Sequence, residues 1–339
     1  MIGGKSNPPF RSQQLAKLAT TVLMCGPSPE YYLKGATLDQ QRTAIALRIV
    51  SGLCITAMTL CVKAVTNDIP LGQIVFFRSF FAFPILIGFL WVSGSFPAGL
   101  KTKNPMGHAW RSIFGATAMF TGFAALKFLP VAEATMISYL FPVFMMVLAV
   151  LVLGERAGKR QWIGVGLGLS GVVALTLPEM EFGASQPRMI GLTLGIVTAM
   201  LGAAALIQVR RLSATEHPGG IAFYFALMSV IAGAMTLPLG WSVPSWENLA
   251  LLVASGLFGG LAHVAMVLAF RIAEASTLAP FEYLTLIWAA AGGFTFFGEN
   301  PRMAFYFAAA FIVSGAIIAT RVKPVGLIPG AMKPDHERN

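Results

Sequence analysis

The sequence predicts an all-α membrane protein with ten transmembrane helices, arranged as two inverted five-helix repeats. Three observations lead to this prediction: the composition, a series of long apolar segments and an internal repeat. Of the 339 residues, 56% are hydrophobic and only 11% are charged, whereas a soluble domain carries about 25% charged residues. So few charges could not cover the surface of a water-soluble protein of this size. With only three cysteines in so long a chain, a disulfide-rich scaffold is also excluded.

The apolar segments have the length of membrane spans. A transmembrane helix needs about 20 mostly apolar residues, and turn-forming residues such as His217-Pro218-Gly219-Gly220 separate the candidates. The expected spans are 43–65, 70–93, 106–127, 131–153, 160–178, 189–209, 219–240, 248–271, 275–297 and 303–321.

Two polar tails flank the spans. Residues 1–41 contain several prolines and basic residues, and their one apolar stretch, Leu15 to Met24, is short and interrupted by Lys17. A signal peptide needs a longer apolar core directly after its basic start, so we expect a cytoplasmic tail instead. The expected domains are the tail 1–41, a first repeat 42–178, a second repeat 188–321 and a second cytoplasmic tail 322–339.

The charges predict the orientation of the chain. If the N-terminus is cytoplasmic, most of the 24 lysines and arginines fall in the tails and the cytoplasmic loops, including Arg111 at the start of the third span. Arg48 and Arg78 lie inside spans, and the opposite side holds only Lys63, Lys127, Arg188 and Arg302. Positive charges concentrate on the cytoplasmic side of membrane proteins. We therefore expect both termini in the cytoplasm of a bacterium, the spans in its inner membrane, and no nucleic-acid partner despite the net charge of +10.

The chain repeats itself at an offset of 144 residues. Matching segments include Phe114-Gly115 with Phe258-Gly259, Tyr139-Leu140 with Tyr283-Leu284, Gly154-Glu155 with Gly298-Glu299, and Ser170-Gly171 with Ser314-Gly315. Because each copy has five spans, the second copy enters the membrane from the opposite side. Secondary transporters have this architecture, with a substrate site near the membrane midplane between the halves.

Several short motifs occur along the two halves: Phe76-Phe77-Arg78, Trp110-Arg111, Ala132-Glu133-Ala134-Thr135, Pro142, Leu153-Gly154-Glu155-Arg156, Ala273-Glu274-Ala275-Ser276, Ala279-Pro280-Phe281-Glu282-Tyr283 and Phe297-Gly298-Glu299. With these motifs the sequence resembles the EamA family of the drug/metabolite transporter superfamily. The resemblance covers roughly residues 43–321, and the family's frequent Arg-Gly pair in the third helix is Arg111-Ser112 here. It implies transport of a small organic metabolite across a lipid bilayer, with no cofactor.

The substrate is a separate question. The run from Ile69 to Arg78 and the segment Ala132–Thr135 are most similar to bacterial riboflavin transporters, so riboflavin uptake is the first hypothesis. Export of an amino acid or a related metabolite is the alternative. A membrane-embedded enzyme would need converging catalytic residues, and the sequence has no paired histidine motif and no nucleophile next to a base. We therefore expect a transporter that is not an enzyme, driven by a gradient.

Two ionisable residues lie at membrane depth. Arg78 is the ninth residue of its expected span, and Glu282 has a similar depth in the ninth span. A charge there costs about 2.5–3.5 kcal/mol and usually faces a partner or a cavity. We expect Arg78 to hold an acceptor group of the substrate, and Glu282 to hold a donor group or a proton. The alternative is a fixed Arg78–Glu282 ion pair that joins the two halves.

Other candidate site residues follow from the repeat. Tyr139 and Tyr283 are repeat-related and could line a symmetric site, or could hydrogen-bond a neighbouring helix instead. Ser138 is the repeat partner of Glu282.

Aromatic residues could form one wall of the substrate site. Most aromatic side chains in the chain are explained by packing or lipid contact. The candidates for the wall are Phe76, Phe80, Phe281, Trp288 and Trp110.

Prolines and small residues predict how helices bend and pack. Pro142 and Pro280 lie within expected helices and could be hinges or static kinks. Gly164 and Gly168 form a GxxxG motif, which predicts close helix contact either within the monomer or in a homodimer.

His263 and the two glutamates at span ends are expected to have structural roles. His263 lies without ligand companions, so no metal site is expected, and a hydrogen-bonded structural histidine is favoured over one that titrates during transport. Glu155 and Glu299 end spans after glycine and are expected to bond free N–H groups of the next helix. Gating pairs with Arg160 and Arg302 are the alternative.

Overall fold

A computed structural model of the chain describes residues 38–153, 159–181, 186–212, 215–272, 278, 281, 284–300 and 303–320. The regular structure in these ranges is helical, which confirms the all-α prediction. Six described segments are long and apolar enough to cross a membrane: Asp39–Val65, Leu71–Val92, Val131–Leu148, Gln186–Val209, Pro218–Leu239 and Trp246–Ala269. Shorter apolar helices are Trp162–Gly171, Leu284–Phe297 and Phe305–Gly315.

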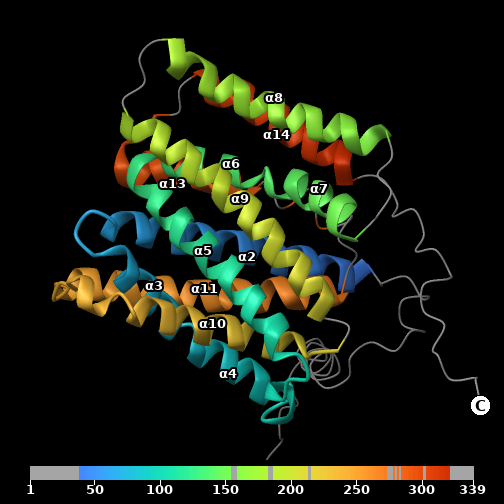
Figure 1. Cartoon of the computed structure of the whole chain (residues 1–339), viewed down its shortest axis with the longest axis vertical. Helices are drawn as coiled ribbons and strands as arrows, with labels where there is room; N and C mark the ends of the chain where they lie inside the picture. Colours follow the sequence, from blue (N-terminus) through green and yellow to red (C-terminus); the bar gives the residue numbers. More distant parts are fainter. Residues whose placement is uncertain are drawn as a thin grey trace, which may run out of the picture.

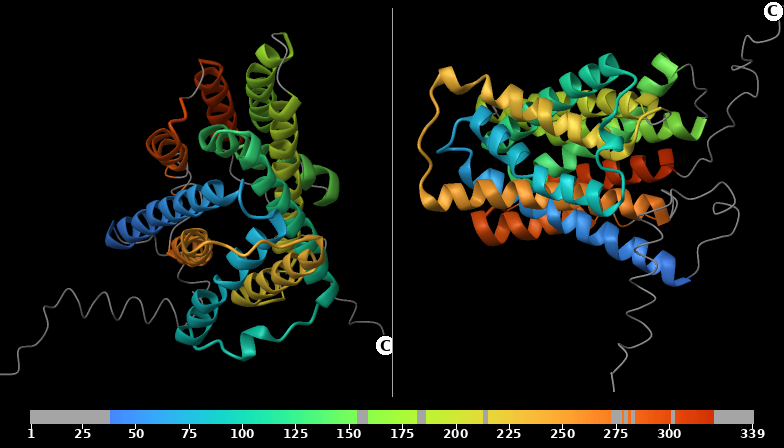
Figure 2. Two further views of the ribbon diagram at one scale, coloured as in Figure 1. Left: turned by 90° about the vertical axis from the view of Figure 1, so that its left-hand side faces the viewer. Right: turned by 90° about the horizontal axis from the view of Figure 1, so that it is seen from below.

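The helices lie side by side in one bundle (Figure 1, Figure 2). The first half of the chain forms α2 (Leu38–Val65), α3 (Leu71–Phe80), α4 (Phe83–Val92), the 3₁₀ turn η2 (Ala98–Leu100), α5 (Pro105–Phe128), α6 (Val131–Ser138), α7 (Phe141–Leu153) and α8 (Lys159–Glu181). The second half forms α9 (Gln186–Leu212), α10 (Pro218–Ala234), the 3₁₀ turn η3 (Leu237–Leu239), α11 (Trp246–Ile272), α13 (Leu284–Phe297) and α14 (Met303–Thr320).

The two halves interlock. The most extensive contacts join a helix of one half to a helix of the other: α2 packs on α11, α5 on α9, α8 on α14, and α3 on α10. The hydrophobic core is therefore shared between the halves. One core cluster, for example, joins Met136 and Ile137 of α6 to Leu192 of α9 and Ile312 of α14.

Two of the expected spans are each broken into two helices. The span 70–93 divides at Phe81 between α3 and α4, and the span 131–153 divides at Tyr139 between α6 and α7. In each case a proline, Pro84 or Pro142, is the second residue of the following helix. Proline has no N–H to give to the preceding turn but is tolerated in the first turn of a helix. Pro84 thus has the same place at the start of α4 as Pro142 has at the start of α7. Pro280 lies outside the described residues.

The small residues of α8 serve packing inside the chain. A Cβ added at Gly315 of α14 would lie 2.6 Å from the carbonyl oxygen of Gly164 and 2.7 Å from the nitrogen of Gly168. Gly171 faces α14 at a similarly short distance, and the two helices run together at one edge of the bundle (Figure 1). The GxxxG motif therefore packs α8 on α14 within the monomer. Gly166, by contrast, faces open space.

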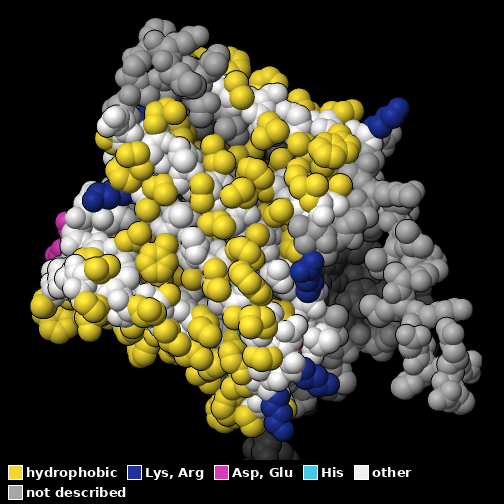
Figure 3. All heavy atoms as spheres, in the orientation of Figure 1, with side chains coloured by type: hydrophobic (Ala, Val, Ile, Leu, Met, Phe, Trp, Pro, Cys, Tyr) yellow, Lys and Arg dark blue, Asp and Glu magenta, His cyan; other side chains and the backbone are white. Residues whose placement is uncertain are grey.

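Polar contacts join loops of the two halves, and neighbouring loops of one half, at one end of the bundle. The Nζ of Lys63, at the end of α2, donates to the carbonyl of Leu129 just after α5 (2.7 Å). The amide of Gln73, near the start of α3, bonds the backbone of Ser242 just before α11. All four residues lie at the side that the charges predict to be outside the cytoplasm. Figure 3 shows hydrophobic side chains over the middle of one face and basic residues towards its edges.

Candidate functional site

Arg78 holds its guanidinium at the middle of the bundle. The residue is buried, and its Nη1 lies 3.3 Å from Sδ of Met119, the fifteenth of 24 residues in α5. On the other side, a Cβ added at Gly259 would lie 3.1 Å from Nε; Gly259 is the fourteenth of 27 residues in α11. The charge therefore lies about half-way along both helices. A thioether is a weak acceptor, and Nε has no hydrogen-bond partner in the described part of the chain.

Arg111 carries the second guanidinium, whose Nε and Nη1 are buried although the residue as a whole is half-buried, and here the structure corrects the expectation of a cytoplasmic charge. The residue is the seventh of α5, and its Cζ lies 4.1 Å from the ring centroid of Phe225 in α10. Its Nη1 lies against Gly115, where a Cβ would overlap it. Because Gly115 leaves room and Phe225 offers a cation–π contact, the side chain runs into the bundle. Its Nε and Nη1 are buried without a hydrogen-bond partner among the described residues.

The two guanidiniums lie close together. Arg111 reaches Gly115, and Arg78 touches Met119, which is one helical turn further along α5. The separation is therefore about 6 Å along the helix axis. His263 of α11 lies one helical turn after Gly259, and its Nδ1 lies 3.2 Å from the carbonyl oxygen of Gly259. Arg78 thus lies between α5 and α11, with His263 one turn along α11 from the glycine that Arg78 adjoins.

The repeat explains part of this geometry. Gly115 and Gly259 are repeat-related, and each lies against a guanidinium where a Cβ would press on it. The sequence contained this signal, because the matched Phe-Gly pairs stand out in the alignment of the two halves. No sequence pattern indicated which side chains would lie beside these two glycines. Arg111 of α5 lies beside Gly115, and Arg78 of α3 lies beside Gly259.

The structure separates several of the other candidates from Arg78. Tyr139 is buried in a hydrophobic cluster at the break between α6 and α7, while Ser138 is exposed and its hydroxyl donates to Thr135 of its own helix. The aromatic ring of Phe76 lies with Phe80 and Trp241 in a separate cluster (ring centroids 5.8 and 5.1 Å away).

The remaining aromatic candidates differ in exposure. Trp110 is 48% exposed and stacks on Phe114, as a lipid-facing residue would. Trp288 is half-buried in α13, and its Nε1 has no partner within the described ranges. Phe281 is helical and half-buried, and its immediate neighbours in the chain lie outside the described residues. Glu282 and Tyr283 lie outside the described residues, as do Glu155, Arg160 (side chain) and Arg302.

An ionic network joins the halves at the end of the bundle where α2 ends and α6 begins. Glu299, after α13, lies 3.4 Å from Nζ of Lys63 and accepts the N–H of Val131 at 2.7 Å. Glu299 thus bonds a free N–H group at a helix N-terminus, as expected, but the helix is α6, which the sequence interpretation did not name. Residues 301 and 302, just before the next helix α14, lie outside the described ranges. Nearby, Arg188 of α9 donates to Glu133 of α6 at 2.9 Å.

A carboxylate also joins the halves at the opposite end of the bundle, where α5 and α10 begin. Glu216, between α9 and α10, accepts hydrogen bonds from the N–H groups of Lys103 (2.7 Å) and Asn104 (3.0 Å) and from the hydroxyl of Thr102 (3.1 Å). Burial alone would raise the pKa of Glu216, but these bonds and the nearby His108 hold its pKa below the ordinary value.

This depressed pKa predicts a loss of stability in acid. A carboxylate with a lower pKa in the folded than in the unfolded state stabilises the fold above the unfolded pKa, and the effect disappears as pH falls through the folded value. The melting temperature in detergent should therefore fall as the pH drops below about 4.5, and Glu216→Gln should weaken this dependence and cost about 1–3 kcal/mol at pH 7. Glu247→Gln, at an exposed position, is the control. An identical pH profile in wild type and Glu216→Gln would contradict the assignment.

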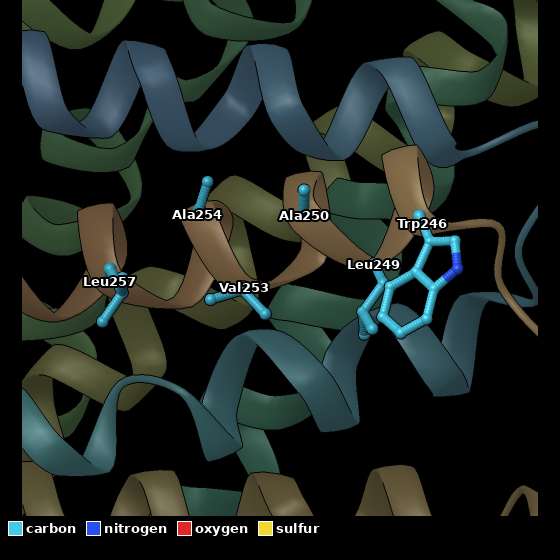
Figure 4. A pocket seen from close by; sticks show the side chains of 6 residues that line it. All are labelled: Trp246, Leu249, Ala250, Val253, Ala254 and Leu257. Atoms are coloured by element: carbon cyan, nitrogen blue, oxygen red, sulfur yellow. The ribbon is translucent and has the colours of Figure 1, made fainter.

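An apolar groove on α11 is a different kind of feature. All six of its lining residues belong to α11 (Figure 4), and none is ionisable: Trp246, Leu249, Ala250, Val253, Ala254 and Leu257. Trp246 is 86% exposed. Such a face suits lipid acyl chains, so the groove is separate from the candidate site.

Comparison with known proteins decides the family. The EamA-like transporter family matches residues 42–177. An S-adenosylmethionine uptake transporter of Rickettsia conorii is 30% identical over 68% of this chain and 76% of its own length. The chain belongs to the EamA-like transporter family. It is thus a membrane transporter of the drug/metabolite superfamily, which confirms the transport class.

Other relatives of this EamA-like transporter differ in substrate and direction. A riboflavin transporter of Rhizobium johnstonii is 26% identical over 80% of this chain and 89% of its own, and a pseudopaline exporter of Pseudomonas aeruginosa is 27% identical over 84% and 99%. A solved crystal structure with 21% identity has a TM-score of 0.60 and covers 82% of this chain and 96% of that one, which shows the shared fold. Membership of the family therefore does not identify riboflavin, or any other of these compounds, as the substrate of this chain.

Proposed function

We propose that the protein is a secondary carrier of the bacterial inner membrane that moves a small organic metabolite by alternating access. The observation that supports this most directly is the buried charge of Arg78 half-way across the bundle, between α5 of the first half and α11 of the second. An ionisable group at membrane depth is costly and marks a substrate or ion pathway. A purely structural helix bundle has no need of it.

The packing of the helices supports two inverted five-helix repeats. The offset of 144 residues maps α2 onto α9 and α5 onto α11, so the pair α2–α11 becomes the pair α9–α5. Both pairs are among the most extensive contacts of the bundle. The pairs α3–α10 and α8–α14 map onto themselves. An exchange of this kind is what a two-fold axis in the membrane plane produces.

The ionic links support alternating access between those halves. Glu299 and Arg188 of the second half bind Lys63 and Glu133 of the first at the non-cytoplasmic end. Glu216 joins the halves at the cytoplasmic end. Rocking of one half against the other would break the links at one end and keep those at the other. A homodimer through the open face of α8 stays a prediction.

The substrate hypotheses differ in charge. Riboflavin uptake follows from the motif resemblance, and a riboflavin transporter is among the relatives. A metabolite of the amino-acid type is the second candidate, and S-adenosylmethionine, which is named for another relative, carries an amino-acid carboxylate. The neighbouring guanidiniums of Arg78 and Arg111 favour this second candidate, because neutral riboflavin has no carboxylate to offer them.

Flux measurements test the proposed function. Purified protein in sealed vesicles should move labelled riboflavin or labelled S-adenosylmethionine faster than empty vesicles, and an imposed pH gradient should change the rate. An expanded panel would add amino acids. Rates equal to those of empty vesicles for every compound, in both directions and with either gradient, would contradict transport by this chain.

The proton role of Glu282 is tested in the same vesicles. If Glu282 holds a proton during the cycle, Glu282→Gln should abolish the effect of the pH gradient while the protein stays folded. Melting temperatures in detergent verify the folding. Unchanged flux with unchanged pH dependence would rule out the proton role.

A further inference from the structure

We infer that Arg78 and Arg111 together form a binding site for an anionic group of the metabolite, either a carboxylate or a phosphate. This inference rests on the proposed function, because it assigns the chemistry of the substrate at the same mid-membrane position. It adds Arg111, which the family comparison does not assign, and it excludes a neutral metabolite as the preferred ligand.

The first argument is that both charges are buried without an acidic partner among the described residues. The acids that form ion pairs inside the described bundle are occupied elsewhere: Glu299 by Lys63, Glu133 by Arg188, and Glu216 by the loop before α5. Buried charges require a counter-charge or full hydrogen bonding. The Nε of Arg78 and the Nε and Nη1 of Arg111 have no hydrogen-bond partner there.

The second argument is geometric. The guanidiniums lie about one helical turn apart along α5, which lets one bound anion contact both. Guanidinium groups present planar forks of N–H donors that match the oxygens of carboxylates and phosphates. Phe225 lies against Arg111, with its ring centroid 4.1 Å from Cζ. A glycine also adjoins each group, Gly115 at Arg111 and Gly259 at Arg78.

The third argument is the position of the site between the halves. Arg78 and Arg111 belong to the first half, and Arg78 lies against Gly259 of the second half. His263 of the same helix α11 lies one turn from Gly259, with its Nδ1 3.2 Å from that glycine's carbonyl oxygen. An anion bound to the two arginines would therefore change the charge that α11 faces. If the halves move against each other as proposed, occupancy of the site acts on an interface between them, the one between α3 and α11.

Paired ligands test the site in purified, detergent-solubilised protein. Binding is measured for S-adenosylmethionine against its decarboxylated form, and for riboflavin 5′-phosphate against riboflavin, so each pair differs in one anionic group. In at least one pair the anionic member should bind about tenfold tighter or more, and the pair that responds tells carboxylate from phosphate. Arg78→Gln and Arg111→Gln should each remove this preference.

Two further variants separate binding from folding and from transport. Arg211→Gln makes the same change at an exposed arginine at the end of α9 and should keep the preference. Arg111→Lys keeps the positive charge but loses the planar set of N–H donors, so it should retain only part of the preference for the anionic ligand. Lack of an anion-dependent difference in both pairs, or a preference that survives both Gln substitutions, would overturn the site. Anion binding in vesicles without flux would reject the proposed transport but not the site.

Discussion

Replacing Arg78 with Gln is expected to lower the transport rate at least about 100-fold while the protein remains folded. Each charge-assisted hydrogen bond to the substrate contributes about 1.5–3 kcal/mol, and the loss of two such bonds corresponds to this factor or more. The change removes a buried charge that has no acidic partner in the described ranges, so the melting temperature should stay the same or rise. Initial flux in vesicles at equal protein content and thermal unfolding in detergent are the two measurements.

The same experiment distinguishes substrate binding from an ion pair with Glu282. If Arg78 and Glu282 formed a fixed pair, Arg78→Gln would leave a buried carboxylate alone and lower the stability markedly. Arg211→Gln serves as the matched control, because this arginine is exposed. A full transport rate in Arg78→Gln would exclude a role in binding, and a strong loss of stability would favour the fixed pair.

The second large effect is expected at Glu299, at the end of the bundle where it binds Lys63. Glu299→Ala should destabilise the protein by about 3 kcal/mol, because it leaves the ammonium of Lys63 without its counter-charge and the N–H of Val131 without an acceptor. Lys63 keeps two backbone acceptors, the carbonyls of Leu126 and Leu129 (2.7 Å each). Thermal or denaturant unfolding in detergent gives the size of the loss.

A double-mutant comparison shows whether the pair itself is responsible. Lys63→Met together with Glu299→Ala should cost less than the sum of the two single changes, because neither charge is then left alone. Glu247→Ala, at an exposed carboxylate on the same side, should change the stability by less than about 0.5 kcal/mol. Equal stability of Glu299→Ala and Glu247→Ala would show that Glu299 does not join the halves.

The architecture was largely predictable because membrane proteins obey few and strong constraints. A hydrocarbon core demands long apolar helices, so composition and segment length predicted an all-helical membrane chain. The breaks at Phe81 and Tyr139 were harder to predict, since proline only marks where a helix can restart. The GxxxG glycines pack against α14 of the same chain. The motif predicts a close helix contact but does not specify which helix is the partner.

The candidate site was predictable only in part. Arg78 could be recognised because a charge within a span is rare. Arg111 could not, because an arginine near the end of a span ordinarily extends to the interface. Its direction was decided by Gly115 and Phe225, which come from different parts of the chain. The same reason applies to the aromatic candidates. Phe76 and Trp110 are residue types that often line pockets, but Phe76 contacts Trp241 and Trp110 contacts Phe114.

The sequence by itself therefore determined the membrane class, the family resemblance and the internal repeat, because these depend on local hydrophobicity and on the order of motifs. Only the tertiary structure decided which charges meet. Whether Glu299 reaches Val131 rather than the next helix, and whether Arg111 lies in the bundle rather than at its surface, depends on how helices from the two halves pack. A side chain several bonds long can point in many directions, and its neighbours in space select one of them.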